Sequence, residues 1–190
     1  LYVRLLSFFP QIKLVGVSGS LAMLNAQPAD DIDLFIITAR DRLWTGRIIA
    51  LTIAQLLGIR RKIYQKKVKD KVCLNLFFDL KNLVVPLRKR NLYVSHEILQ
   101  MKPLVDKDNT YVSFLQKNKW VSNFLPNFSC PEAPHINKEK YCSIMADWIE
   151  AVLKRFQLTI IKRHRTKELI TNNQLWFFPQ DFQEKITDMI

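Results

Sequence analysis

Cysteine and glycine are scarce in this chain of 190 residues, which has three cysteines and four glycines. Cys73, Cys130 and Cys142 are odd in number and irregularly spaced, which argues against a secreted disulfide scaffold and favours a reducing, cytoplasmic location. With eight prolines beside the four glycines, turn residues are too few for a collagen-like or turn-dense all-β protein. Helix with some strand is therefore the default expectation.

Long apolar runs are also missing. The most apolar helical run, Ile48–Ile59, is too short to span a membrane and is closed by Arg60, Arg61 and Lys62, so we expect no membrane partner. Repeats of solenoid period are not visible. Leu1 rather than Met opens the chain inside what reads as a structured segment, and we therefore expect a fragment of a longer product.

Acidic residues are outnumbered, with 17 Asp and Glu against 29 Lys and Arg, a formal net charge of +12. Such an excess favours an anionic partner, for example a nucleotide, nucleic acid or an anionic membrane surface, although a merely solvated basic face is the alternative. Because 48% of the residues are hydrophobic, a packed core is expected and disorder is excluded as the main state.

Hydrophobic periodicity predicts an α/β (α+β) fold with a small mixed sheet and flanking helices in residues 1–105, followed by a mainly helical region in residues 106–190. The expected strands are Ile12–Val17, Asp31–Thr38 and Val72–Phe78. The expected helices are Val3–Phe9, Leu21–Asn25 with Ser20 as its cap, Arg40–Leu57, Leu92–Met101, Tyr111–Leu125 and Lys138–His164.

The most informative stretch is GVSGSLAMLNAQPADDIDLFII, residues 16–37. Asp31 and Asp33 are two apart, and on a strand that spacing sends both carboxylates to one face. Two close like charges need a cation between them, and carboxylate oxygens suit Mg²⁺. Gly19 permits close approach of a ligand to the backbone, and Ser20 offers a hydroxyl and backbone N–H groups at a helix start, which favours an anion there.

This stretch resembles the signature of the polymerase-beta-like nucleotidyltransferase superfamily, a Gly-Ser pair (Gly19, Ser20) followed some ten residues later by Asp-apolar-Asp (Asp31, Asp33). The resemblance is specific over Leu14–Thr38 and looser to Leu80, with weaker support from Lys102–Leu115. It implies that the Gly-Ser turn binds the triphosphate of an NTP such as ATP, and that the aspartates bind two Mg²⁺ (or Mn²⁺) ions. The implied reaction moves a nucleoside monophosphate to an acceptor hydroxyl and releases pyrophosphate.

One position departs from the family pattern, in which a neighbouring strand supplies a third carboxylate. The strand Val72–Leu80 offers Asn75 at its centre and Asp79 near its end. By simple alternation both face the same side, about 13 Å apart, so only one can meet the metals. Asn75 is the preferred equivalent because a polar side chain within a buried strand is costly without a purpose, whereas Asp79 at the strand exit is easily solvated. An amide can offer a carbonyl oxygen to a cation but accepts no proton, so this choice implies weak or absent activity.

Other residues give weaker signals. Cys130, His135 and Cys142 match no zinc-finger spacing, and His96 reads as a helix surface or packing residue. The basic cluster Lys162–Lys167 complements a helix end or, with Trp148, Phe156 and Trp176, contacts nucleic acid. Lysines of Lys66–Lys71, or Arg40 and Arg42, are expected to add charge around the phosphates.

The first hypothesis is thus a Mg²⁺-dependent nucleotidyltransferase whose acceptor is RNA or a small molecule. The second is a catalytically weakened module of the same fold that binds nucleotide or nucleic acid. The third is a basic α/β domain with no nucleotide site. The sequence determines neither the acceptor, the NTP nor the oligomeric state.

Overall fold

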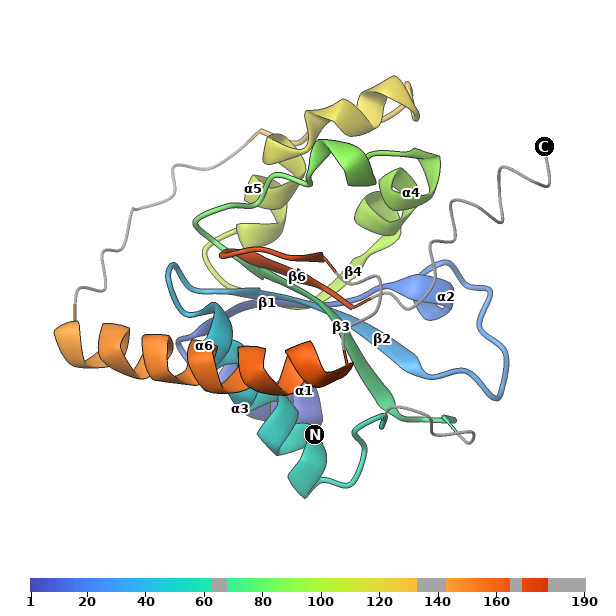
Figure 1. Cartoon of the computed structure of the whole chain (residues 1–190). Coiled ribbons are helices and arrows are strands. Elements are labelled where there is room, and N and C mark those ends of the chain that lie inside the picture. Colours follow the sequence, from blue (N-terminus) through green and yellow to red (C-terminus); the bar gives the residue numbers. More distant parts are fainter. Residues whose placement is uncertain (63–67, 133–142, 165–168, 178–190) are drawn as a thin grey trace.

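A computed structural model of the chain describes residues 1–62, 68–132, 143–164 and 169–177. One six-stranded sheet lies at its centre, with strand order β4-β1-β2-β3-β6-β5 (Figure 1). Strands β2 and β3 are parallel and every other neighbouring pair is antiparallel. The strands are β1 (Ile12–Val17), β2 (Ile32–Thr38), β3 (Val72–Asp79), β4 (Lys102–Asp106), β5 (Leu169–Ile170) and β6 (Gln174–Trp176).

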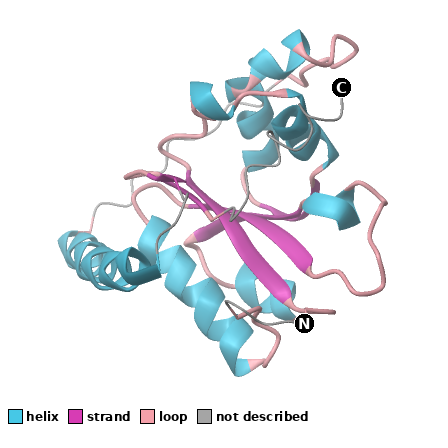
Figure 2. Ribbon diagram, turned by 45° about the vertical axis from the view of Figure 1, so that its right-hand side comes forward, coloured by secondary structure: helices cyan, strands magenta, loops and turns pink. Residues whose placement is uncertain are grey.

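Helices cover both faces of this sheet (Figure 2). We call α1, α3 and α6 the lower layer, and α4 and α5 the upper layer, as they lie in Figure 1. Their bounds are α1 (Tyr2–Ser7), α2 (Gly19–Ala22), α3 (Leu43–Leu56), α4 (Leu92–Gln100), α5 (Thr110–Lys117) and α6 (Ile144–His164), with 3₁₀ turns at Leu87–Lys89 and Lys119–Asn123. The expected mixed sheet with flanking helices is confirmed.

Strands β2 and β3 are central because their sequences are apolar on both faces. The burial of β2 is nearly continuous from Leu34 to Thr38, as expected for a strand covered by helices on both sides. The parallel pairing of β2 with β3 requires a crossover, which α3 supplies. Alternate residues of β2 divide between two cores: Leu34 and Ile36 pack with the lower layer, whereas Phe35 and Ile37 pack with the upper layer.

The sequence pattern does not predict three of the strands, β4, β5 and β6. Strand β4 lies at the sheet edge and is largely exposed, and β5 and β6 have two and three residues, so none carries a long apolar run. The pairing of β6 with β3 shows that the region after residue 106 contributes strands as well as helices. The division at residue 105 stays a prediction, with one sheet drawing residues from both sides of it.

The observed helices differ from the expected ones in their bounds, and two of these differences change the interpretation. Helix α2 begins at Gly19, so Ser20 lies inside it rather than at its cap. The expected helix Tyr111–Leu125 is divided into α5 and a 3₁₀ turn. Within the described residues, no helix combines the length and apolar character needed to cross a membrane.

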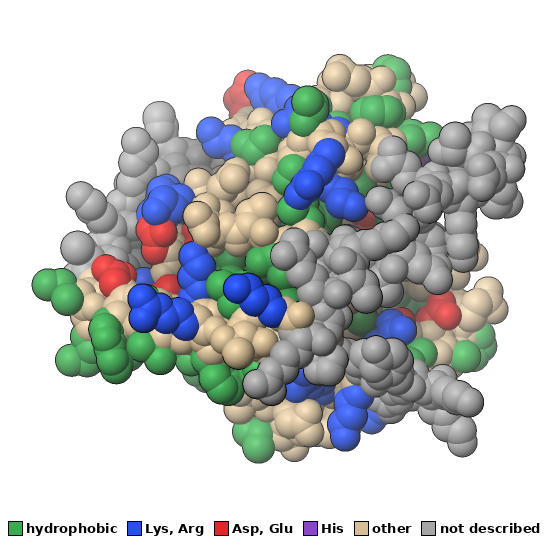
Figure 3. Space-filling model, in the orientation of Figure 1, with side chains coloured by type: hydrophobic (Ala, Val, Ile, Leu, Met, Phe, Trp, Pro, Cys, Tyr) green, Lys and Arg blue, Asp and Glu red, His purple; other side chains and the backbone are tan. Residues whose placement is uncertain are grey.

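The surface of α6 is unusual because its outward side is apolar. Figure 3 shows hydrophobic side chains along the lower side of α6, with Lys and Arg side chains spread over the rest of this face. The most exposed of these residues are Ile144, Met145, Trp148 and Phe156. Trp148 and Phe156 are therefore accessible, whereas Trp176, expected to join them in contacting nucleic acid, is buried in the sheet against Phe78.

Candidate functional site

Asp31 and Asp33 lie at the start of β2, the strand from which both carboxylates reach the upper side of the sheet. One oxygen of each carboxylate and the Sγ of Cys73 on β3 lie within 4.8 Å of one another. Cys73 is brought there by strand register, since it pairs with Asp33 in the parallel ladder. We call Asp31, Asp33 and Cys73 the acidic cluster.

The Gly-Ser turn lies directly beside this cluster. Gly19 has φ +65°, and a Cβ built on it would overlap the Asp33 carboxylate. The turn is tied to β2 by a hydrogen bond from Ser18 N to Asp33 O of 3.0 Å. The absent side chain of Gly19 is therefore what allows the Asp33 carboxylate to occupy its position.

Ser20 has a different neighbour. Its hydroxyl donates to Asp30 Oδ2 at 2.9 Å, and the same oxygen accepts a hydrogen bond from Gln27 N. These bonds close the loop between α2 and β2. The structure thus places Gly19 against the acidic cluster and engages the Ser20 hydroxyl outside it.

Asn75 bridges Cys73 and Asp33. The Cys73 thiol donates to Asn75 Oδ1 at 2.8 Å, and Asn75 Nδ2 donates to Asp33 Oδ1 at 2.7 Å. Burial, followed by the charges of Asp33 and Asp31, raises the pKa of the Cys73 thiol to about 12, so it remains a neutral donor. In this arrangement Asn75 presents its NH₂ group to the cluster and its carbonyl oxygen to the thiol.

Arg61 is the cation that the structure adds to the cluster. Its NH1 lies 2.5 Å from Asp31 Oδ2 and 3.5 Å from Cys73 Sγ. Arg61 follows α3 and reaches the cluster because its backbone N donates to Val72 O, beside the start of β3. Sequence reasoning used Arg61 only to close an apolar run, and no local motif identifies its role.

Asp33 is the most strongly perturbed carboxylate of the cluster. Burial, then the charges of Asp31 and Glu97, raise its pKa to about 7, against the lowering effect of Arg61. Glu97 is itself on α4, and its Oε2 accepts a hydrogen bond from Gly19 N at 3.3 Å. Burial raises the pKa of Glu97 as well, although hydrogen bonds from Gly19 and Tyr93 oppose this. Three carboxylates thus lie around one glycine turn.

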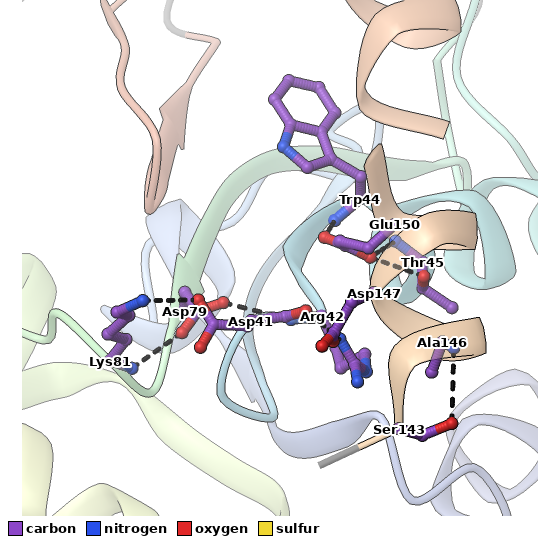
Figure 4. Close-up of polar contacts among 10 residues, drawn as sticks. All are labelled: Asp41, Arg42, Trp44, Thr45, Asp79, Lys81, Ser143, Ala146, Asp147 and Glu150. Carbon is purple, nitrogen blue, oxygen red and sulfur yellow. Dashed lines mark hydrogen bonds and ion pairs between the residues drawn. The ribbon is translucent and has the colours of Figure 1, made fainter. Parts of the chain in front are cut away.

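Asp79 does not join the acidic cluster. It pairs with Thr38 at the opposite end of the β2–β3 ladder from Asp33 and Cys73. There its carboxylate accepts hydrogen bonds from the backbone N of Arg42 at 3.2 Å and of Lys81 at 2.7 Å (Figure 4). The interpretation of Asp79 as a possible third carboxylate is corrected: it holds the turn after β3 and the start of α3.

The expected face of Asp79 is also wrong, because β3 does not alternate regularly. Its register against β2 shifts between Asp33 and Phe35. Val72, Leu74 and Phe77 pack with the lower layer, whereas Leu76 and Phe78 pack with the upper layer. The change from even to odd numbers shows an extra residue in the middle of the strand. Asn75 and Asp79 therefore lie on opposite sides of the sheet.

Among the expected phosphate-binding cations that the structure describes, Arg42 and Lys71 contact residues outside the acidic cluster. Arg42 lies at the start of α3, where its NH1 pairs with Asp147 at 2.7 Å, and Arg40 lies beyond the far end of β2. Lys69 and Lys71 lie in the loop before β3, and Lys71 Nζ donates to Gly58 O. Lys66 and Lys67 lie outside the described residues.

The remaining sequence candidates form no metal-binding group within the described residues. Cys130 is half-buried and free, whereas His135 and Cys142 lie outside the described residues. His96 is half-buried on α4. Lys162 is exposed at the end of α6, but the rest of the cluster up to Lys167 has no described side chains.

Comparisons with known proteins give little further information. No protein-family model matches the chain, and no curated protein matches it. Among solved structures, it is similar to a chain of a mutant MntA-HpeT toxin-antitoxin crystal structure, with 17% sequence identity and a TM-score of 0.38 over 65% of this chain and 84% of that chain. A likeness this weak carries no functional argument, so the function is argued from the acidic cluster and its surroundings.

Proposed function

We propose that this chain is a nucleotidyltransferase that uses Mg²⁺ or Mn²⁺ to transfer a nucleoside monophosphate from an NTP to an acceptor hydroxyl, releasing pyrophosphate. The observation that carries the proposal is the acidic cluster itself. Asp31 and Asp33 converge beside a glycine turn, where the parallel strands β2 and β3 begin. This agrees with the Gly-Ser and Asp-x-Asp resemblance of the sequence.

The donor set fits a hard divalent cation. Two carboxylates offer charged oxygens, the ligands that Mg²⁺ prefers, whereas the neutral Cys73 thiol is a poor ligand for it. Burial, and after it repulsion by the charges of Asp31 and Glu97, raises the pKa of Asp33. A bound cation would compensate that repulsion, and Arg61 does so for Asp31 in this structure.

In the proposed reaction, Asp31 and Asp33 would hold divalent cations, which when bound would supply positive charge for activation of the acceptor hydroxyl and for the leaving pyrophosphate. Gly19 leaves room for phosphate oxygens beside these carboxylates, because any side chain there would block the approach. When Asp31 binds a cation instead of Arg61, the Arg61 guanidinium is free to pair with a phosphate. Asn75 keeps Asp33 oriented through its 2.7 Å hydrogen bond.

A second candidate function is a catalytically weakened module that binds nucleotide or nucleic acid through the same fold. Asn75 favours this second candidate. Its amide lies on β3 beside Asp33 and can accept no proton from an acceptor hydroxyl. The high positive charge suits either function, and the acceptor, RNA or a small molecule, stays open.

Pyrophosphate release separates these candidates. The chain is incubated with each NTP, Mg²⁺ or Mn²⁺, and cell extract as the source of acceptor, and transferred nucleotide is sought by mass spectrometry. The proposal expects release that depends on the cation and disappears in Asp31→Asn. Nucleotide binding without release, in the wild type and under every condition, would favour the non-catalytic module instead.

A further inference from the structure

Glu97 is a half-buried residue whose carboxylate the resemblance does not assign. It lies on α4, and its side chain reaches the Gly19 turn, where Oε2 accepts the hydrogen bond from Gly19 N. The other oxygen, Oε1, is buried and accepts no hydrogen bond within the described part of the chain. A buried carboxylate oxygen without a partner is costly, which points to a missing positive group.

The position of Glu97 relative to Asp33 is defined by Gly19. The Asp33 carboxylate lies where a Cβ of Gly19 would be, and Glu97 Oε2 lies at the backbone N of the same residue. Both carboxylates therefore flank the Gly19 turn, one from β2 and one from α4, and the charge of Glu97 acts on Asp33, while the ligand atoms within 4.8 Å of one another are those of Asp31, Asp33 and Cys73. Tyr93, one turn before Glu97 on α4, has its hydroxyl hydrogen-bonded to the Glu97 carboxylate.

Charge around the glycine turn is unbalanced. Asp31, Asp33 and Glu97 bring three carboxylates, and Arg61 is the cation paired with this group in the described residues, through Asp31. Carboxylates that share a site in this way are stabilised by a divalent cation more than by one guanidinium. The group as a whole has the composition of a cation site with three acids.

We propose that Glu97 is the third carboxylate of the cation site, and that it supplies from helix α4 the negative charge that Asn75 does not supply from strand β3. This inference rests on the proposed function, since it takes Asp31 and Asp33 as the other cation ligands. It relocates the third acid from the sheet to the upper helical layer.

The test measures Mn²⁺ binding without nucleotide, by titration calorimetry and by the electron paramagnetic resonance signal of free Mn²⁺. The full chain is compared with Asp31→Asn, with Glu97→Gln, and with Glu132→Gln as a control at an exposed glutamate. Glu97→Gln should weaken Mn²⁺ binding by about tenfold or more, whereas Glu132→Gln should leave it unchanged.

A double variant distinguishes a lost cation ligand from misfolding. Asn75→Asp adds a carboxylate next to Asp33, so Glu97→Gln with Asn75→Asp should recover most of the lost Mn²⁺ affinity. Thermal melting without cation checks the fold: Glu97→Gln removes one of three close acids and should melt no earlier than the wild type.

The outcomes separate the inference from the proposed function. If the wild type binds no Mn²⁺, the cation site of the proposed function is wrong, and the inference is wrong with it. If Asp31→Asn weakens binding while Glu97→Gln behaves as Glu132→Gln does, the cation site stands and the inference is overturned. In that case Glu97 serves only to hold the backbone N of Gly19.

Discussion

Among single residues, Asp33 is the carboxylate of the acidic cluster whose pKa is most strongly raised. Its pKa rises from an ordinary value of 3.8 to about 7 because it is buried beside Asp31 and Glu97. A carboxyl group with a raised pKa in the folded state is least costly when it is protonated. Its contribution to folding stability is therefore greatest below about pH 4 and is lost as the pH rises through about 7.

Asp33→Asn should remove this loss of stability. The variant keeps a carbonyl oxygen to accept from Asn75 but has no charge to desolvate, so its free energy of unfolding should fall less than that of the wild type between pH 4 and pH 7. Urea denaturation at several pH values, without divalent cations, measures the difference. Glu132→Gln, at an exposed position, is the control for a lost charge. Parallel pH profiles for Asp33→Asn and wild type would contradict this view of Asp33.

Gly19 is important for folding as well as for the proposed nucleotide site. From the sequence, Gly19 is expected to let a ligand approach the backbone. The positive φ and the nearby Asp33 carboxylate show that any side chain there would also destabilise the fold. A non-glycine residue at such a φ costs about 1–3 kcal/mol.

Gly58→Ala provides a matched control for this position. Gly58 has φ +66°, nearly that of Gly19, but a Cβ there would meet nothing within 4 Å. Gly19→Ala should therefore lower the free energy of unfolding by more than Gly58→Ala does, and the excess measures the displacement of Asp33. Equal decreases in the free energy of unfolding for the two variants, measured by chemical denaturation, would show that the Asp33 carboxylate can move without destabilising the fold.

At the scale of elements, the start of α3 depends on other parts of the chain. No side chain of its own caps this helix. Instead, Glu150 of α6 accepts hydrogen bonds from Trp44 N at 2.7 Å and from Thr45 N at 2.9 Å (Figure 4). A carboxylate at these unpaired N–H groups satisfies donors that the first helical turn leaves free.

Glu150→Ala should therefore destabilise the protein by about 1–3 kcal/mol, since it leaves two backbone donors and the Thr45 hydroxyl without their acceptor. Hydrogen exchange should show faster exchange of the Trp44 and Thr45 amides than in the wild type. Lys154→Ala on the same helix, whose amine donates to the exposed Asn172, is the comparison. Unchanged protection of both amides would refute the capping role.

The elements also show what the sequence could and could not predict. Strand β2 and the convergence of Asp31 with Asp33 follow from an apolar run and a two-residue spacing, both local properties. The extra residue within β3 has no local signal, and it reverses the face of Asp79. Arg61 and Glu97 reach the site through tertiary packing of a loop and of α4, which no spacing in the sequence encodes.

At the scale of the whole molecule, the two ends of β2 and β3 have different roles. The end of β2 and β3 near Asp33 carries the acidic cluster, whereas the end near Asp79 anchors α3 and, through Asp147 and Glu150, α6. Substitutions at the two ends should therefore have different consequences, for ligand binding at the first and for stability at the second. The upper helical layer closes the acidic cluster by supplying Glu97 from α4.

We propose above that Asp31 and Asp33 form a cation-dependent nucleotide site. Titration calorimetry of the full chain with ATP, with and without Mg²⁺, measures this binding. The comparison is between wild type, the double variant Asp31→Asn with Asp33→Asn, and Asp70→Asn, an exposed aspartate whose left-handed φ asparagine tolerates. We expect Mg²⁺-dependent ATP binding by the wild type and by Asp70→Asn, and loss of this binding in the double variant. Equal ATP affinity in the double variant and the wild type would show that these aspartates form no such site.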